Sequence, residues 1–171
     1  MILDVGIRIG SLSSLRETLL FDASYRHKHH NKPDCDECCR CHHQEDHVCK
    51  ASEEPSCDEL KCQGGLVNRR RLSTNLGVNT APAIHIGRVA LGDGVMKSGV
   101  DRDEIVEQEG IIAFEMEGAG VWDVMPCLII KAICDYSDSH KNKRFQPYAA
   151  ASAAACAKAI LQEWGSTPEE L

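Results

Sequence analysis

The chain has 171 residues, of which 43% are hydrophobic, and a formal net charge of -7. A chain of this length can bury one core, and its apolar content excludes global disorder. The negative charge argues against nucleic acid or an anionic membrane surface as the main partner. No run of about 18 apolar residues is available to span a membrane. The first residues also lack a secretory signal, so we expect a cytoplasmic protein.

The first half of the sequence divides into two regions of different composition. Residues 1–25 form a short mixed segment, in which 15–21 predicts a brief amphipathic helix. Residues 26–80 are rich in His, Cys and charged residues and poor in apolar ones. Such a stretch is too long for an ordinary loop in a compact domain, which predicts a mobile or metal-clipped insertion.

The insertion carries most of the ten cysteines, which we expect to be reduced thiols or metal ligands rather than disulfides. Zinc takes four thiolate or imidazole ligands in a tetrahedron, and a Cys-x-x-Cys turn supplies two of them. The candidate ligands are Cys35, Cys38, Cys41, His42, His47 and Cys49, with Cys57 and Cys62 as alternatives. Because the candidates outnumber four, the spacing selects no set, and a thiol-rich loop without metal is the alternative. We expect His27 on a wet surface and His140 as a structural histidine.

From residue 82 onward, strand-like and helix-like segments alternate. Strands are predicted at 83–91, 111–114 and 127–133, and helices at 101–109, 117–124 and 145–164. This order predicts an α/β fold of three layers, with a parallel or mixed sheet and flanking helices. Residues 81–165 form this unit and 166–171 a tail. Three strands make a small sheet, so the unit has the character of the second half of a larger α/β domain.

Two acidic residues follow consecutive strands of this unit. Glu117 and Asp135 are expected to face one crevice, because open α/β sheets bind ligands beyond the carboxyl ends of their strands. A carboxylate suits a vicinal diol, and an acid in a dry crevice has a raised pKa and can protonate a leaving group. Cleavage of a glycosidic bond needs both functions. The alternative is that Glu117 belongs to a helix first turn and Asp135 to a cap or an Asx-turn.

Several motifs in this region resemble one protein family. The segments 92–96, 114–117, 133–143 and 148–151, together with 20–27 and 66–69, resemble the C-terminal half of the nucleoside phosphorylase and nucleosidase superfamily. The likeness is to its fungal branch, in which this domain stands before NACHT and ankyrin or TPR regions. It covers roughly residues 18–164 and is interrupted by the Cys/His-rich insertion.

The resemblance implies roles for individual residues. Glu117 would bind the ribose hydroxyls, with Met116 packed under the sugar. Asp135 would be the general acid that protonates purine N7. The other positions that it implies around the substrate are Glu115, Val95, Met96 and Cys134.

The superfamily's first half supplies a phosphate loop, an arginine and, in nucleosidases, a carboxylate that activates water; none has a convincing match here. The resemblance thus implies N-glycosidic cleavage of purine nucleosides in impaired form, with phosphate as a possible co-substrate and no required cofactor. It also implies a small-molecule nucleoside or nucleotide partner and a homo-oligomer. The alternatives are a non-catalytic nucleotide-sensing or self-association module and a zinc-clipped interaction protein.

Overall fold

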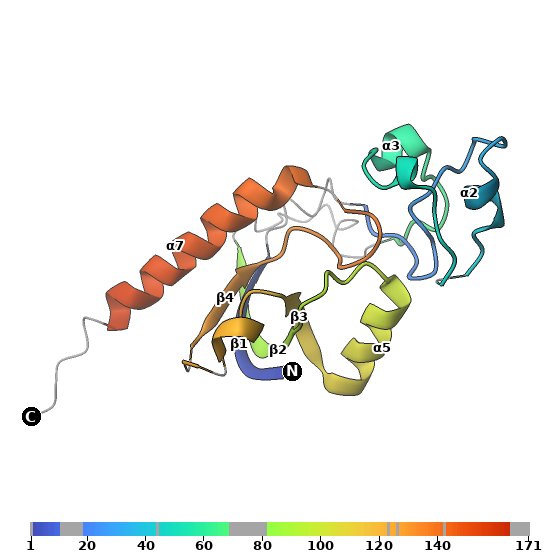
Figure 1. Cartoon of the computed structure of the whole chain (residues 1–171). Helices are drawn as coiled ribbons and strands as arrows, with labels where there is room; N and C mark the ends of the chain where they lie inside the picture. The colour runs from blue at the N-terminus through green and yellow to red at the C-terminus, as the bar shows by residue number, and fades with distance from the viewer. Residues whose placement is uncertain are drawn as a thin grey trace, which may run out of the picture.

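The computed structural model describes residues 2–10, 19–43, 45–68, 82–122, 124–125, 127–141 and 143–164. It is a mixed α/β structure with a long C-terminal helix (Figure 1). The elements in chain order are β1 (Ile2–Gly10), α2 (Asp36–Arg40), the 3-10 turn η1 (Lys50–Ser52), α3 (Cys57–Leu60), β2 (Ala83–Leu91), α5 (Gly99–Glu109), β3 (Ile111–Glu115), α6 (Ala119–Trp122), β4 (Ile129–Ala132), η2 (Lys143–Phe145) and α7 (Gln146–Trp164).

The four strands form one sheet in the order β3-β2-β1-β4. The pairs β2–β3 and β1–β4 are parallel, whereas β1 and β2 are antiparallel, with Gly10 opposite Ala83. The sheet is therefore mixed, which is one of the two arrangements that the sequence predicts. Because β1 lies between β2 and β4, β4 runs in the opposite direction to β2 and β3.

β1 was not predicted, since residues 1–25 were expected to form a mixed segment with a short helix. Most of the predicted helix 15–21 lies outside the described residues. Its last residues are not helical, because Phe21 forms an isolated β-bridge with Leu66.

The elements predicted after residue 82 are largely confirmed. β2 has the expected bounds, and β3 shows the alternating burial of a strand with one covered face. α5 starts at Gly99 and is capped by the preceding Ser98, whose hydroxyl accepts a hydrogen bond from the Asp101 N–H at 3.2 Å. It ends at Gly110, whose φ of 63° is the left-handed conformation that glycine adopts readily. α6 and β4 are shorter than predicted.

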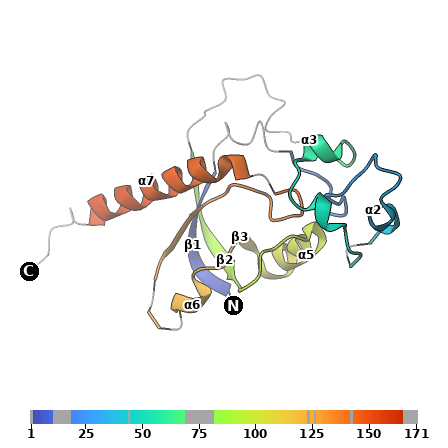
Figure 2. The same ribbon diagram turned by 45° about the horizontal axis from the view of Figure 1, so that its top comes forward.

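α7 confirms the predicted alanine-rich helix, with Pro147 in its first turn, where a missing N–H costs little. It packs against β4 and β1. Its C-terminal part extends beyond the sheet in both ribbon views, and there Leu161 and Trp164 are 71% and 79% exposed (Figures 1 and 2). Within the described residues, no helix has the length and apolar character needed to cross a membrane.

Two buried clusters organise the described part of the chain. The first joins β2 and β3 and contains Val89, Leu91 and Ala113, against which Trp122 and Ile129 pack. The second lies in the N-terminal half and contains Phe21, Leu60 and Cys62, with Tyr25 and Cys57 against it. The described part of the predicted insertion, residues 26–43 and 45–68, is called the Cys/His segment below. It therefore folds against a small core rather than forming an open loop.

The Cys/His segment and the residues just before it contact the sheet unit at two places. A Cβ added to Gly99 would lie 2.6 Å from the carbonyl oxygen of Ala23, so the start of α5 packs directly on that backbone. The connection between β4 and α7 also runs toward this segment in both ribbon views (Figures 1 and 2). There the N–H of His27 donates to Ser139 Oγ at 3.1 Å.

Candidate functional site

A pocket of about 400 Å³ lies beside the carboxyl end of β3. This volume is in the range of small-molecule sites, which combine apolar walls with a few polar groups. One side carries acidic residues from the turn after β3, and the other is formed by the approach to β4 and β4 itself. The lining residues are Glu115, Glu117, Gly118, Val121, Cys127, Leu128, Ile129, Ile130 and Lys131.

Glu115 holds the turn that forms the acidic side of the pocket. Its side chain is buried, and its carboxylate accepts the N–H groups of Glu117 at 3.0 Å and Gly118 at 2.9 Å. A Cβ on Gly118 would lie 2.6 Å from Glu115 Oε1 and 2.8 Å from Ile129 Cδ1, so this close approach requires glycine. Gly120, two residues further along the chain, has open space around it. The Glu115 carboxylate is thus bound to backbone N–H groups. The resemblance implied that this residue contacts the substrate.

Glu117 and Met116 belong to this turn and are exposed. Glu117 lines the pocket, and its carboxylate accepts the Met116 N–H at 3.4 Å. Lys131 brings a cation to the same pocket. The carboxylate of Glu117 can accept hydrogen bonds from hydroxyl groups. The ammonium of Lys131 can attract an anionic group.

Asp135, the predicted general acid, is held elsewhere by its own loop. Its Oδ1 accepts the Ser137 N–H at 2.8 Å and lies 3.0 Å from Nζ of Lys141. Asp135 does not line the pocket beside Glu117. The expectation of a shared crevice assumed parallel strands, and it loses its geometric basis because β4 runs opposite to β3. Burial, together with the neighbouring Asp135, raises the pKa of the Cys134 thiol.

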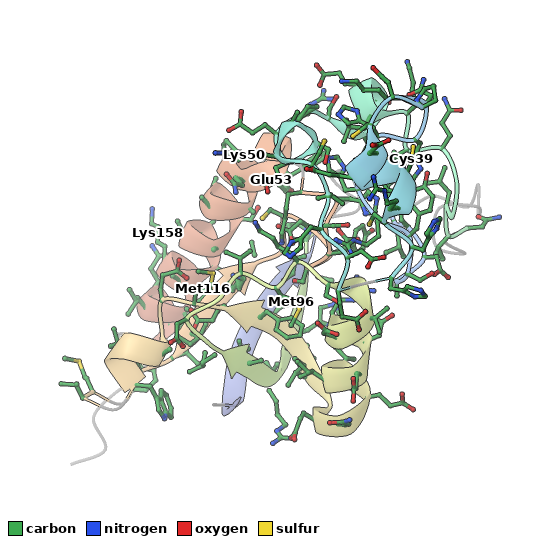
Figure 3. All side chains as sticks on the ribbon, turned by 45° about the vertical axis from the view of Figure 1, so that its right-hand side comes forward. Cys39, Lys50, Glu53, Met96, Met116 and Lys158 are labelled. Atoms are coloured by element: carbon green, nitrogen blue, oxygen red, sulfur yellow. The ribbon has the colours of Figure 1, made fainter. Side chains whose placement is uncertain are left out.

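The predicted base-pocket residues lie in the connection between β2 and α5. Val95 is 51% exposed and Met96 half-buried, and neither lines the pocket. Figure 3 labels Met96, which belongs to the connection after β2, and Met116, which belongs to the turn after β3.

The predicted metal ligands are partly brought together. The sulfur atoms of Cys35, Cys38 and Cys49 all lie within 4.8 Å of one another, a group that could hold a metal ion. Cys38 Sγ is 3.7 Å from Cys49 Sγ. Cys41 is buried apart from this group, with its sulfur 3.9 Å from the carbonyl oxygen of Asp46. His42 and His47, the remaining predicted ligands, are exposed and also lie outside it.

Cys38 is the buried member of this cysteine group. Its burial alone would raise the pKa of its thiol, but hydrogen bonds from the backbone of Cys49 and His29 and from the Cys35 and Cys49 thiols lower it to about 7. The thiolate is the form of cysteine that binds metals. This is a microenvironment in which a cysteine loses its proton near neutral pH.

A second group with metal-ligand chemistry joins Cys62, an alternative ligand by sequence, to two histidines that the sequence does not indicate as ligands. Ligand atoms of His27, Cys62 and His140 lie within 4.8 Å of one another, and all three residues are buried. The expectation that His27 sits on a wet surface is therefore wrong. Cys57 adjoins this group: its thiol donates to the Cys62 sulfur, which lowers the pKa of Cys62 and raises that of Cys57.

The loop after β4 is fixed from two sides. Nη1 of Arg102 in α5 donates to the Tyr136 carbonyl oxygen at 2.7 Å and lies 3.9 Å from Asp138 Oδ2. Asp138 is buried and accepts the His140 N–H at 2.8 Å. Through His140 the same loop reaches the second metal-ligand group.

Comparison with known proteins identifies a partial relative. The chain is 46% identical over 80 residues to a protein of Hyaloscypha variabilis described as a nucleotide-binding leucine-rich repeat (NLR)-like protein. The matched stretch is 47% of this chain but only 8% of the length of that relative. The chain thus shares partial homology with a fungal NLR-like protein. No protein-family model matches the chain, and no solved structure matches it.

Proposed function

We propose that this chain is a nucleoside-recognition domain, derived from the nucleoside phosphorylase and nucleosidase superfamily, in which ligand binding is kept and turnover is reduced. The proposal rests on one observation: Glu117 lines a pocket of small-molecule size, whereas Asp135 does not. Glu117, the residue expected to bind the ribose, is therefore separated from Asp135, the residue expected to donate the proton.

The pocket has the chemistry that a nucleoside needs. Glu117 provides a carboxylate for the vicinal ribose hydroxyls, and an apolar wall that includes Leu128 and Ile130 can cover a base. Lys131 favours a ligand that carries phosphate. The family motifs around Glu117 and the name of the fungal relative point in the same direction, because that relative is described as nucleotide-binding.

Low turnover follows from the contacts of Asp135. General acid catalysis requires a proton on a group within hydrogen-bonding reach of the leaving base. The Asp135 carboxylate instead accepts hydrogen bonds from Lys141 and Ser137. Without a positioned acid, a large share of the rate enhancement is lost, since such groups typically contribute about 10²–10⁴-fold.

The test measures binding and turnover on the same protein. Adenosine, inosine and ATP are titrated by calorimetry, and free base is measured by chromatography with and without phosphate. We expect binding that Glu117→Gln weakens at least about tenfold, equivalent to about 1.4 kcal/mol. The matched control Glu107→Gln, on the exposed face of α5, should bind normally. Phosphate-dependent base release at ordinary enzymatic rates, abolished by Asp135→Asn, would contradict reduced turnover. Absence of binding to all three would contradict recognition.

The homo-oligomer that the resemblance implies is part of the same proposal. Light scattering coupled to size-exclusion chromatography measures the mass of the native chain directly. A monomer at all concentrations would remove this element and leave the binding test unaffected.

A second candidate function is a zinc-clipped interaction protein, favoured by the group Cys35, Cys38 and Cys49. The Cys38–Cys49 sulfur separation of 3.7 Å is close to the edge of a tetrahedron with Zn–S bonds of about 2.3 Å. Zinc bound there would stabilise the turn around α2. Metal analysis of Cys38→Ser tests it, because loss of zinc relative to the native chain is expected only if these thiols are ligands.

A further inference from the structure

We propose that His27, Cys57, Cys62 and His140 bind one structural zinc ion, which ties the Cys/His segment to the loop between β4 and α7. These residues come from three parts of the chain. His27 precedes α2, and His140 lies in the loop before α7. Cys57 is the first residue of α3, and Cys62 follows its last turn. Two thiolates and two imidazoles form a common ligand set of structural zinc.

The distances from His27 to the two sulfur atoms suit a zinc tetrahedron. Nδ1 of His27 lies 3.6 Å from Cys57 Sγ and 3.8 Å from Cys62 Sγ. With Zn–S bonds near 2.3 Å and Zn–N bonds near 2.0–2.1 Å, sulfur and nitrogen ligands on one edge are about 3.6 Å apart. His140 contributes a ring nitrogen within 4.8 Å of the His27 and Cys62 ligand atoms. The Cys57 sulfur lies beside His27 but not within 4.8 Å of all three atoms, so it would move toward the ion to complete the set.

His27 is oriented as metal-bound histidines are. Its Nε2 lies 2.9 Å from the carbonyl oxygen of Pro55. A carbonyl can only accept a hydrogen bond, so Nε2 carries the hydrogen and Nδ1 of the neutral ring presents its lone pair to the two sulfur atoms. A carbonyl that fixes the second ring nitrogen in this way is typical of zinc-bound histidine.

His140 supplies an independent observation. Its side chain is only 1% exposed, and neither ring nitrogen has a nitrogen or oxygen partner within the described part of the chain. The Cys62 sulfur is a polar atom beside this ring. The closest carboxylate, Asp138 Oδ1, is 3.8 Å from Nδ1, which is too long for a hydrogen bond. The ring is stacked on Phe21 at a centroid distance of 4.0 Å, which fixes its plane. Buried polar atoms without partners are rare and costly, and coordination of a metal would satisfy one of these nitrogens.

The same residues are poorly suited to covalent catalysis. A nucleophilic cysteine paired with a histidine must be reached by its substrate, but Cys62 is 5% exposed and His27 and His140 are each 7% exposed. Four protein ligands would also leave zinc no open position for water or substrate, which is the arrangement of structural rather than catalytic sites. The ion would therefore act as a cross-link between segments distant in sequence.

Zinc is measured by mass spectrometry on the native 171-residue chain purified without chelators, beside Cys62→Ser, His140→Gln and Cys39→Ser. Cys39 lies in α2 of the same segment, but it is exposed and outside both cysteine groups (Figure 3). We expect each of the first two variants to lose one equivalent of zinc, and Cys39→Ser to lose none. Cys38→Ser separates this site from the Cys35–Cys38–Cys49 group, because it should leave the present site loaded.

Two further readouts keep the proposal testable if the variants fail to fold. The native chain loaded with ¹¹³Cd should give an NMR signal at the shift of a site with two sulfur and two nitrogen ligands. Mass spectrometry under non-reducing conditions should show Cys57 and Cys62 as thiols. Unchanged zinc in folded Cys62→Ser and His140→Gln, lack of that cadmium signal, or a Cys57–Cys62 disulfide would each overturn the proposal.

Discussion

Nζ of Lys141 lies 3.0 Å from Oδ1 of Asp135, and the Ser137 N–H donates to the same oxygen at 2.8 Å. Both partners belong to the loop in which Asp135 itself lies. The carboxylate therefore closes a local turn, as an Asx-turn residue does. This was the alternative that the sequence left open for Asp135, beside its role as a general acid.

The ion pair between Lys141 and Asp135 should contribute little to stability. The two side chains are 29% and 21% exposed, so water screens much of their attraction. We expect Lys141→Gln to lower the free energy of unfolding by no more than about 1 kcal/mol. Urea denaturation measures it, with Lys158→Gln on the exposed face of α7 as the control. A loss of several kcal/mol would show that the pair has a larger structural role.

Truncation of Glu115 should destabilise the chain much more than truncation of Glu117. Glu115→Ala would leave the buried N–H of Gly118 without its acceptor, at a cost of about 1–3 kcal/mol in the free energy of unfolding. Glu117→Ala removes an exposed carboxylate and should change stability by less than about 0.5 kcal/mol. Denaturant titration of both variants compares them directly. Equal destabilisation would mean that Glu117 also supports the turn.

Gly118 and Gly120 form a matched pair for testing the pocket turn. Gly118→Ala would place a methyl group against Glu115 and Ile129, so we expect destabilisation of about 1–3 kcal/mol. Gly120→Ala meets open space within α6 and should be neutral or stabilising by up to about 1 kcal/mol. Thermal melts decide between these outcomes. A stable Gly118→Ala chain would show that Ile129 can move away at little cost.

The turn around Asp46 should lose stability only below the ordinary pKa of an aspartate. The N–H groups of His43 and His42 donate to its carboxylate at 2.7 Å each, and these bonds lower the pKa of Asp46 below its ordinary value of 3.8. A carboxyl group whose pKa is lower when folded stabilises the turn above that ordinary value. This contribution disappears as the pH falls through the lower, folded value.

NMR can follow the amide signals of His42 and His43 during acid titration. Their midpoint should lie below pH 3.8, and Asp46→Asn should abolish the transition. Asp34→Asn, an exposed acid in the same segment, should leave it unchanged. A midpoint above 3.8 would contradict the contact between Asp46 and these amides.

Local signals predicted much of the second half of the chain. Ser98 and Gly110 delimit α5 because capping chemistry depends only on neighbouring residues. The alanine-rich run of α7 is likewise a local preference. Strand pairing is not local, so the position of β1 could not be read from the order of strands and helices. The alternation of Leu3, Val5, Ile7 and Ile9 is the local signal in the sequence that indicates this strand.

The metal-ligand groups show the same limit. Cys35 and Cys38 were found because they sit on one turn. His27 and His140 were not, because their approach depends on how the Cys/His segment docks on the loop after β4. Sequence spacing carries no information about such contacts between distant segments.

The central position of β1 has a consequence for how the chain folds. Its neighbours are β2, where Ala83 pairs with Gly10, and β4, where Ala132 pairs with Ile9. Closing such long loops is entropically costly and slows folding. During synthesis, β2 leaves the ribosome before β4, so the edge of β1 that pairs with β4 stays unpaired longest. Such edges are sites of misassociation, so newly made chains are expected to depend on chaperones more than the length of the protein alone would require.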